Sequence, residues 1–178
     1  MTRRIVLTGP ECTGKTTLAA ALARRLGAAW LPEASRQFAE EVQRELTAAD
    51  AGLIAERAIR AEDAALADHP RLLVLDTDLI STVVYCRHYY GACPEWIEAA
   101  ARARRGDLYL LCAPDLEWTA DGVRDRPAYR EEMFALFGAA LKEFGCVSAG
   151  VSGTGPARER AALAAAAPVA AVAAVVHA

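Results

Sequence analysis

The sequence predicts an α/β fold in which a five-stranded parallel sheet lies between two layers of helices. Short apolar runs alternate with longer segments of helical periodicity along the whole chain. The run at residues 72–75 is apolar without interruption, which is typical of a strand buried on both faces of a parallel sheet. The chain contains no internal repeat and no low-complexity linker. These observations favour a doubly wound three-layer sandwich, whose ligands bind at the carboxyl ends of the strands.

Each strand of this sheet corresponds to a short apolar run. The predicted strands are residues 5–7, 28–31, 72–75, 108–112 and 147–151. The predicted helices are residues 16–26, 34–46, 47–69, 79–90, 94–105, 130–144 and 161–176. Thr47 and Asp50 have the spacing of a capping box, with Asp in place of the usual Glu, so a helix is expected to start there. Pro168 is expected to break the last helix and leave a loose tail.

Length and composition set limits on the class of protein. With 178 residues, 54% of them hydrophobic, the chain fits one domain at 1–178. The net charge of −3 supplies no basic field for nucleic acid, and no apolar segment is long enough for a membrane span, so neither partner is expected. Five widely spaced cysteines without a CxxC pair fit the reduced thiols of a cytoplasmic protein. The oligomeric state is not determined, and a homo-oligomer remains an open alternative.

A phosphate-binding loop is the clearest motif. Residues 9–16, GPECTGKT, match GxxxxGK[ST] and lie between a predicted strand and a predicted helix. Glycines let backbone N–H groups turn towards a phosphate, and the N-terminus of the helix directs its positive end to the same point. We therefore expect ATP to be bound here. The expected nucleotide-binding residues are Gly9, Glu11, Cys12, Thr13, Gly14, Lys15, Thr16 and Thr17.

Individual roles follow from the chemistry of these side chains. Lys15 should reach the β- and γ-phosphates, and Thr17 the α-phosphate. Thr16 offers a hydroxyl to Mg²⁺, and Asp76, which ends a buried apolar run, would hold a water of that Mg²⁺. Asp78 would point towards the substrate. For both aspartates the alternative is that they only cap the following helix.

Five segments of the sequence resemble the kinase domain of the NadR-type nicotinamide riboside kinases. They are GPECTGKTTL, PEASRQF, LDTDLISTVVY, DLYLL and EWTADGVRD, which occur in this order, and the resemblance covers roughly residues 3–160. It implies a P-loop NTPase fold of the nucleoside or nucleotide kinase type with a short lid. It also implies an ATP- and Mg²⁺-dependent enzyme that phosphorylates the 5′-hydroxyl of a ribonucleoside.

The resemblance implies several substrate-side residues. Glu33 is similar to the acid that related nucleoside kinases place beside the sugar hydroxyl, and Asp78 is the alternative general base. Arg36, one helical turn later, would pair with Glu33, contact the phosphoryl group or form a plain surface ion pair. Tyr89 and Trp118 are the expected aromatic contacts. Pro32 stands where the family places an aromatic side chain. Trp30, two residues earlier and on the same face of the strand, is expected to pack in the core, with substitution for the missing aromatic side chain as the alternative.

Arginines gather after the fourth predicted strand, where small P-loop kinases carry a lid. The lid is expected at about residues 118–130, with Arg124 first and Arg126 second as the residue that closes on the γ-phosphate. A solvated loop without a specific role is the alternative. Near the C-terminus, residues 153–158 are expected to wrap the adenine, with Arg158 as a nucleotide contact; a plain strand-to-helix turn would also need the glycines.

Three other functions remain open at this stage. A kinase of a different small hydroxyl compound would need the same loop and acids. A regulatory ATPase or GTPase switch would need no hydroxyl substrate, although the NKxD motif of guanine-specific switches does not occur. A polynucleotide-end kinase is disfavoured by the acidic charge balance. Because the nucleotidyltransferase and DNA-binding parts of NadR proteins are not included in these residues, we expect neither adenylyl transfer nor a transcriptional role.

Overall fold

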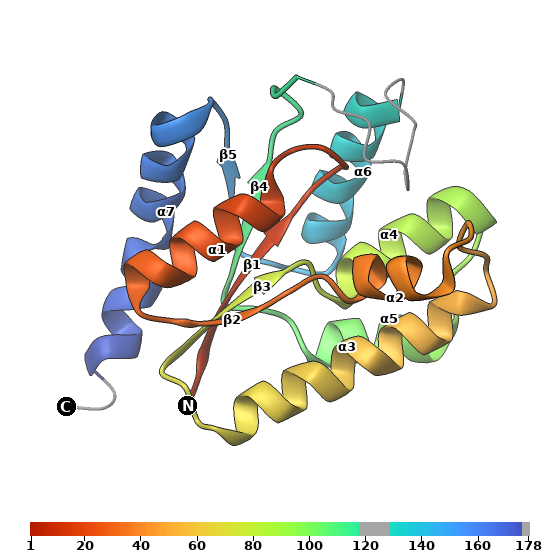
Figure 1. The fold of residues 1–178 in the computed structure, drawn as a ribbon, viewed down its shortest axis with the longest axis horizontal. Coiled ribbons are helices and arrows are strands. Elements are labelled where there is room, and N and C mark those ends of the chain that lie inside the picture. The colour runs from red at the N-terminus through yellow and green to blue at the C-terminus, as the bar shows by residue number, and fades with distance from the viewer. Residues whose placement is uncertain (118–128, 176–178) are drawn as a thin grey trace.

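Five parallel strands form a single sheet in the computed structural model, which describes residues 1–117 and 129–175 (Figure 1). The strands are β1 (Arg3–Thr8), β2 (Ala29–Leu31), β3 (Leu72–Asp76), β4 (Leu108–Cys112) and β5 (Ser148–Val151). Their order across the sheet is β2-β3-β1-β4-β5. The predicted fold class is therefore confirmed.

Helices cover both faces of this sheet (Figure 1). One face packs against α1 (Lys15–Leu26) and α7 (Gly155–Val175), which share a hydrophobic core with alternate residues of the strands. The opposite face packs against a second core, built from four helices. These are α3 (Asp50–Ala67), α4 (Leu79–Tyr90), α5 (Glu95–Ala103) and α6 (Arg130–Glu143). The short helix α2 (Ala34–Val42) packs against α3.

The register of the sheet places the phosphate loop beside an acid. β1 is central, and its Leu7 lies opposite Asp76 at the carboxyl end of β3. On its other side, Thr8 lies opposite Leu111 near the end of β4. Because all strands are parallel, the loop that follows β1 meets the segments that follow β3 and β4 at one edge of the sheet.

Several helix ends differ from the predictions, and α7 begins at Gly155, six residues before its predicted start at residue 161. Helix α2 stops at Val42, not at residue 46, because Gln43 adopts a left-handed conformation (φ 51°) and the next residues turn towards α3. Helix α7 continues through Pro168 to Val175, so the predicted break is wrong. Pro168 and Ala164 are both exposed, so the carbonyl that Pro168 deprives of a helical partner lies where water can reach it. No helix in residues 1–117 and 129–175 is long and apolar enough to cross a bilayer.

Candidate active site

The loop between β1 and α1 has the curvature that phosphate binding requires. Gly9 has φ 131°, and a Cβ at this position would lie 2.7 Å from the carbonyl oxygen of Cys112, so no other residue fits. Gly14, directly before α1, is left-handed with φ 73°. The ammonium of Lys15 lies inside the loop, 7% exposed, and donates to the carbonyl oxygen of Pro10 at 2.6 Å. The loop therefore holds a cation at the N-terminus of a helix.

Asp76 is a buried carboxylate beside this loop. Both of its oxygens are buried, and neither accepts a hydrogen bond within the described residues. Burial raises the pKa of Asp76, and the nearby charge of Glu33 raises it further, against the opposing influence of the Thr16 hydroxyl and of Lys15 and Arg36. A carboxylate without a partner next to a hydroxyl fits Mg²⁺, which takes one or two protein oxygens and completes its shell with water and phosphate.

Within the parts of the chain that the structure describes, no group of three or more His, Cys, Asp or Glu side chains converges as a metal site. A cation held only by protein ligands is thus not supported there. Thr16 and Asp76 would hold Mg²⁺ only together with the oxygens of a bound nucleotide and water.

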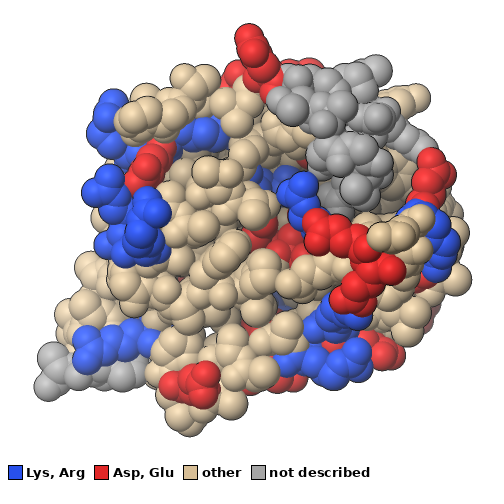
Figure 2. Space-filling model, viewed as in Figure 1, with Lys and Arg blue, Asp and Glu red and all other residues tan. Residues whose placement is uncertain are grey.

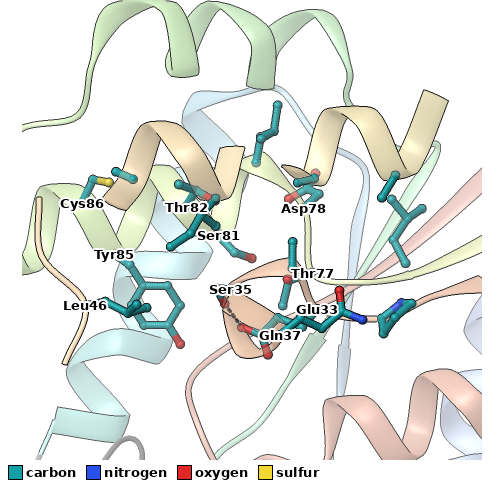
Figure 3. A pocket seen from close by; sticks show the side chains of 18 of the residues that line it. Glu33, Ser35, Gln37, Leu46, Thr77, Asp78, Ser81, Thr82, Tyr85 and Cys86 are labelled. Atoms are coloured by element: carbon teal, nitrogen blue, oxygen red, sulfur yellow. Dashed lines mark hydrogen bonds between the residues drawn. The ribbon is translucent and has the colours of Figure 1, made fainter. Parts of the chain in front are cut away.

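A cavity of about 440 Å³ opens next to the phosphate loop. Figure 3 shows its walls: Glu33 and Ser35 at the start of α2, Thr77 and Asp78 after β3, and Ser81, Thr82 and Tyr85 along α4. Another wall comes from α3, whose lining residues are apolar except for Glu62. Its volume lies in the range of small-molecule sites.

The charged residues that line the cavity are all acidic in the part of the chain that the structure describes, and one of them, Glu62, is ion-paired with Arg4 and Arg104. Among the described residues that line the cavity, none is Lys, Arg or His. Its acidic lining residues are Glu11, Glu33, Glu45, Glu62 and Asp78. On the face shown in Figure 2, acidic side chains also gather over α2. Three tyrosines complete the lining, and the rings of Tyr85 and Tyr89 are stacked 6.0 Å apart.

Glu33 lies where the cavity meets the phosphate loop. It occupies the N-cap position of α2, is 7% exposed and accepts a hydrogen bond from the Ser35 hydroxyl at 2.5 Å (Figure 3). The charge of Glu33 contributes to the raised pKa of Asp76. Glu33 therefore places a buried carboxylate in the wall of the cavity.

Asp78 caps α4 and also lines the cavity, so its position in the cavity does not exclude the capping role. One carboxylate oxygen accepts from the Ile80 N–H at 3.0 Å, and the other accepts from the Tyr109 hydroxyl at 2.5 Å. Burial raises the pKa of Asp78 to about 6, although these hydrogen bonds act to lower it. The Tyr109 partner was not predicted; the only sequence signal is a polar-tipped residue inside an apolar strand.

The other predicted substrate-side residues have mixed outcomes. Tyr89 lines the cavity, and so does Pro32. Arg36 forms an exposed ion pair with Glu40 at 3.5 Å. Trp30 is 42% exposed on the edge strand β2, so the expected core packing of Trp30 is wrong. Trp118, Arg124, Arg126 and most of the predicted lid lie outside the described residues.

Arg158, which was predicted to contact the nucleotide, binds three loops at the edge of the sheet. Its side chain is buried, and its guanidinium donates to the carbonyl oxygens of Thr13, Ala113 and Gly153 and to the carboxylate of Asp115. All these partners belong to loops, one of which is the phosphate loop. Arg158 thus contacts the back of the nucleotide site through the protein, and no adenine contact is needed to explain its position.

The profile of an AAA domain family, AAA_28, matches residues 4–160. The chain belongs to this family. Among curated relatives, the trifunctional NAD biosynthesis/regulator protein NadR of Escherichia coli K12 is 27% identical over 128 residues, which are 68% of this chain and 31% of that protein. NadR of Salmonella typhimurium LT2 is 27% identical over 140 residues, 72% of this chain and 34% of that protein. This AAA_28 chain therefore spans about a third of the length of these relatives.

Solved structures agree with the family assignment. The crystal structure of a NadR protein in complex with NR has a TM-score of 0.79 at 25% identity, over 96% of this chain and 52% of that chain. A NadR complex with NAD and AMP-PNP has a TM-score of 0.78 at 21% identity, over 96% of this chain and 50% of that chain. Thymidylate kinase from Ehrlichia chaffeensis has a TM-score of 0.62 at 14% identity, over 87% of this chain and 90% of that chain. The predicted resemblance to NadR is confirmed.

Proposed function

We propose that this AAA_28 chain is a nucleoside kinase that transfers the γ-phosphoryl group of ATP to the 5′-hydroxyl of nicotinamide riboside. The observation that carries this proposal is the cavity beside the phosphate loop, whose charged described residues are all acidic. A nucleoside monophosphate would bring a phosphate dianion among these carboxylates, whereas a cationic pyridinium ring is attracted to them and to aromatic faces. The similarity to a NadR structure in complex with NR supports the same acceptor.

The phosphate side of the proposed reaction uses the loop residues. Backbone N–H groups of residues 11–16 and the Lys15 ammonium would hold the β- and γ-phosphates, and Thr17 would contact the α-phosphate. Thr16 and Asp76 would hold Mg²⁺, which neutralises the charge that develops on the phosphates during transfer. The burial of Lys15 keeps this ammonium from bulk water, so its attraction to a phosphate is screened less than it would be at the surface.

The acceptor side uses Glu33. In the proposed step the 5′-oxygen attacks the γ-phosphorus, the bond to the β–γ bridging oxygen breaks, and ADP leaves. Glu33 orients the hydroxyl and accepts its proton, because this buried carboxylate lines the same cavity as Glu11 of the phosphate loop. Asp78 is the weaker candidate for this role, since each of its two oxygens already accepts a hydrogen bond.

A coupled ADP-release assay tests the proposal. The acceptors are nicotinamide riboside, common ribonucleosides and deoxyribonucleosides, and thymidine monophosphate, each with Mg-ATP. We expect turnover with nicotinamide riboside and a loss on the order of 10²–10³-fold in kcat for Lys15→Ala. Lys142→Ala, at an exposed position of α6, is the matched lysine control and should retain wild-type turnover.

Glu33→Gln and Asp78→Asn decide between the two acids. We expect the Glu33 variant to lose most of its turnover and the Asp78 variant to retain more. ATP binding without transfer to any acceptor would contradict the kinase and indicate a regulatory ATPase. Turnover with thymidine monophosphate alone would assign a nucleotide kinase.

The charge of the ring is tested separately with dihydronicotinamide riboside, which has nearly the same shape and no positive charge. If the acidic wall selects the cation, this uncharged acceptor should have a KM about ten-fold higher, the effect of one favourable charge interaction of roughly 1.4 kcal/mol. Equal KM values for the two compounds would show that the carboxylates do not select the ring charge.

A further inference from the structure

Arg158, near the start of α7, joins three loops at the carboxyl edge of the sheet. One terminal nitrogen donates to the carbonyl oxygen of Thr13 at 2.9 Å and to that of Ala113 at 3.0 Å. The other terminal nitrogen donates to Asp115 at 2.6 Å and to the carbonyl oxygen of Gly153 at 3.0 Å. The side chain is 4% exposed. A buried guanidinium with four such bonds is held in one orientation.

Arg130, the first residue of α6, makes a second connection to the same loop. It donates to the carbonyl oxygen of Cys12 at 3.1 Å and to that of Leu116 at 3.0 Å. The two arginines thus bind successive carbonyls of the phosphate loop, although they lie 118 and 145 residues from their loop partners in sequence. Neither contact is explained by the helices to which the arginines belong.

The direction of these carbonyls determines the direction of two amides. In a planar trans peptide the C=O of one residue and the N–H of the next point in opposite directions. The carbonyls of Cys12 and Thr13 point towards the guanidiniums, so the N–H groups of Thr13 and Gly14 point away from them. Cys12 (φ 53°) and Gly14 (φ 73°) are left-handed, a pattern that forms anion-binding concavities from successive N–H groups.

We propose that Arg130 and Arg158 are positioning residues for nucleotide binding, which hold the N–H groups of Thr13 and Gly14 towards the phosphates. The proposal rests on the ATP-binding part of the proposed function. A loop whose amides are already oriented loses less conformational freedom when ATP binds, so its affinity is higher. The planar fork of arginine supplies several donors in fixed directions, which a lysine cannot do.

The first test compares nucleotide affinities by calorimetry. The variants are Arg158→Gln, Arg158→Lys and Arg130→Gln. The control is Arg105→Gln, because Arg105 also donates to two carbonyls, of Phe144 at 2.6 Å and of Arg102 at 3.0 Å, at the opposite edge of the sheet. We expect about ten-fold weaker binding of ATP and ADP for the phosphate-loop variants, unchanged binding of adenosine, and wild-type values for the control.

The second test needs no nucleotide. Hydrogen exchange of the amides in residues 12–16 of the free protein should be faster in the Arg130 and Arg158 variants and unchanged in the Arg105 control. Arg130→Gln is the informative variant if Arg158→Gln does not fold, since Arg130 is only half-buried.

Three results would overturn the inference. Wild-type ATP affinity and exchange in all folded variants would show that the arginines do not act on the loop. Equal weakening for ATP, ADP and adenosine would assign Arg158 to the adenine instead. A wild-type protein without ATP affinity would overturn the proposed function as well, which separates that failure from the first two.

Discussion

Two carboxylates only two residues apart, Asp76 and Asp78, are buried in different ways. Asp78 has a hydrogen-bond donor for each oxygen. Asp76 has none among the described residues, and burial raises its pKa. A buried carboxylate without a partner costs free energy in the folded protein unless a cation compensates it. At the scale of single residues, the buried charge of Asp76 thus destabilises the free protein, and a metal ion bound beside it would compensate that charge.

Replacing Asp76 by Asn tests this balance. We expect Asp76→Asn to unfold at a higher temperature than wild type in the absence of ligands, with a gain of roughly 1–2 kcal/mol, because a neutral amide costs less to bury. The variant should also lose the additional stabilisation that Mg-ATP gives over metal-free ATP. Thermal unfolding with and without Mg²⁺ measures both effects. The control is Asp68→Asn, at an exposed position, and a wild-type response to Mg²⁺ in Asp76→Asn would contradict the metal assignment.

The residues around the phosphates differ in how far the sequence predicts them. Gly9, Gly14 and Lys15 follow from a local pattern, because the conformation of that loop depends mainly on its own residues. Tyr109 and Arg130 reach the site from distant segments, and a tyrosine in an apolar strand or an arginine at a helix start is ordinary in sequence. Their roles depend on the packing of β4 and α6, which a local pattern does not contain.

Among the elements, the segment between α2 and α3 connects helix capping to the cavity. Asp50 accepts two hydrogen bonds from Arg44, at 2.7 and 2.8 Å, and two more from the N–H and hydroxyl of Thr47, at 2.8 and 2.9 Å. The predicted capping box is therefore half formed, since the Thr47 hydroxyl donates to Asp50 instead of accepting from its N–H. Glu45, Leu46 and Thr47 line the cavity, so Asp50 holds part of its wall.

Removing this carboxylate should affect the acceptor and not ATP. We expect Asp50→Ala to lower the free energy of unfolding by about 1–3 kcal/mol, because the hydrogen bonds from Arg44 and Thr47 to a charged group are lost. The KM for the nucleoside should rise while the KM for ATP stays unchanged. Steady-state kinetics with each substrate varied in turn measures the difference. The control is Asp63→Ala, because Asp63 lies on the same helix as Asp50 and forms an ion pair with Arg104 at the surface. A parallel rise of both KM values would contradict this account.

For the whole molecule, buried and paired acids make opposite contributions to stability as pH changes. Ion pairing with Arg44 and Arg87 lowers the pKa of Asp50 and Glu143, so their stabilisation is complete above about pH 4.5 and is lost as pH falls through their folded pKa values. Burial raises the pKa of Asp76 and Asp78, the latter to about 6. Between about pH 4 and 6 the folded state therefore holds more protons than the unfolded state at Asp78, and the pKa of Asp76 is displaced in the same direction, so stability falls as pH rises.

The free protein should accordingly be most stable on the acidic side of neutrality, near pH 5. Urea unfolding at a series of pH values from 3.5 to 8 measures the profile. In Asp78→Asn the decline between pH 5 and 7 should be smaller, because one of the two raised carboxyl groups is absent. A maximum at pH 7 or above in the wild type would show that Asp76 and Asp78 ionise normally in the folded state.

The enclosure of Lys15 also has a practical consequence for chemical labelling. Lys15 and Lys142 are the only two lysines of the chain, one 7% exposed inside the phosphate loop and the other on the surface of α6. An amine-directed acylating reagent read by peptide mass spectrometry would thus report on one buried and one exposed lysine in the same molecule. The label on Lys142 calibrates the reagent. The ratio of the Lys15 label to the Lys142 label then measures how much of the phosphate loop is occupied by nucleotide, without turnover and without a mutation.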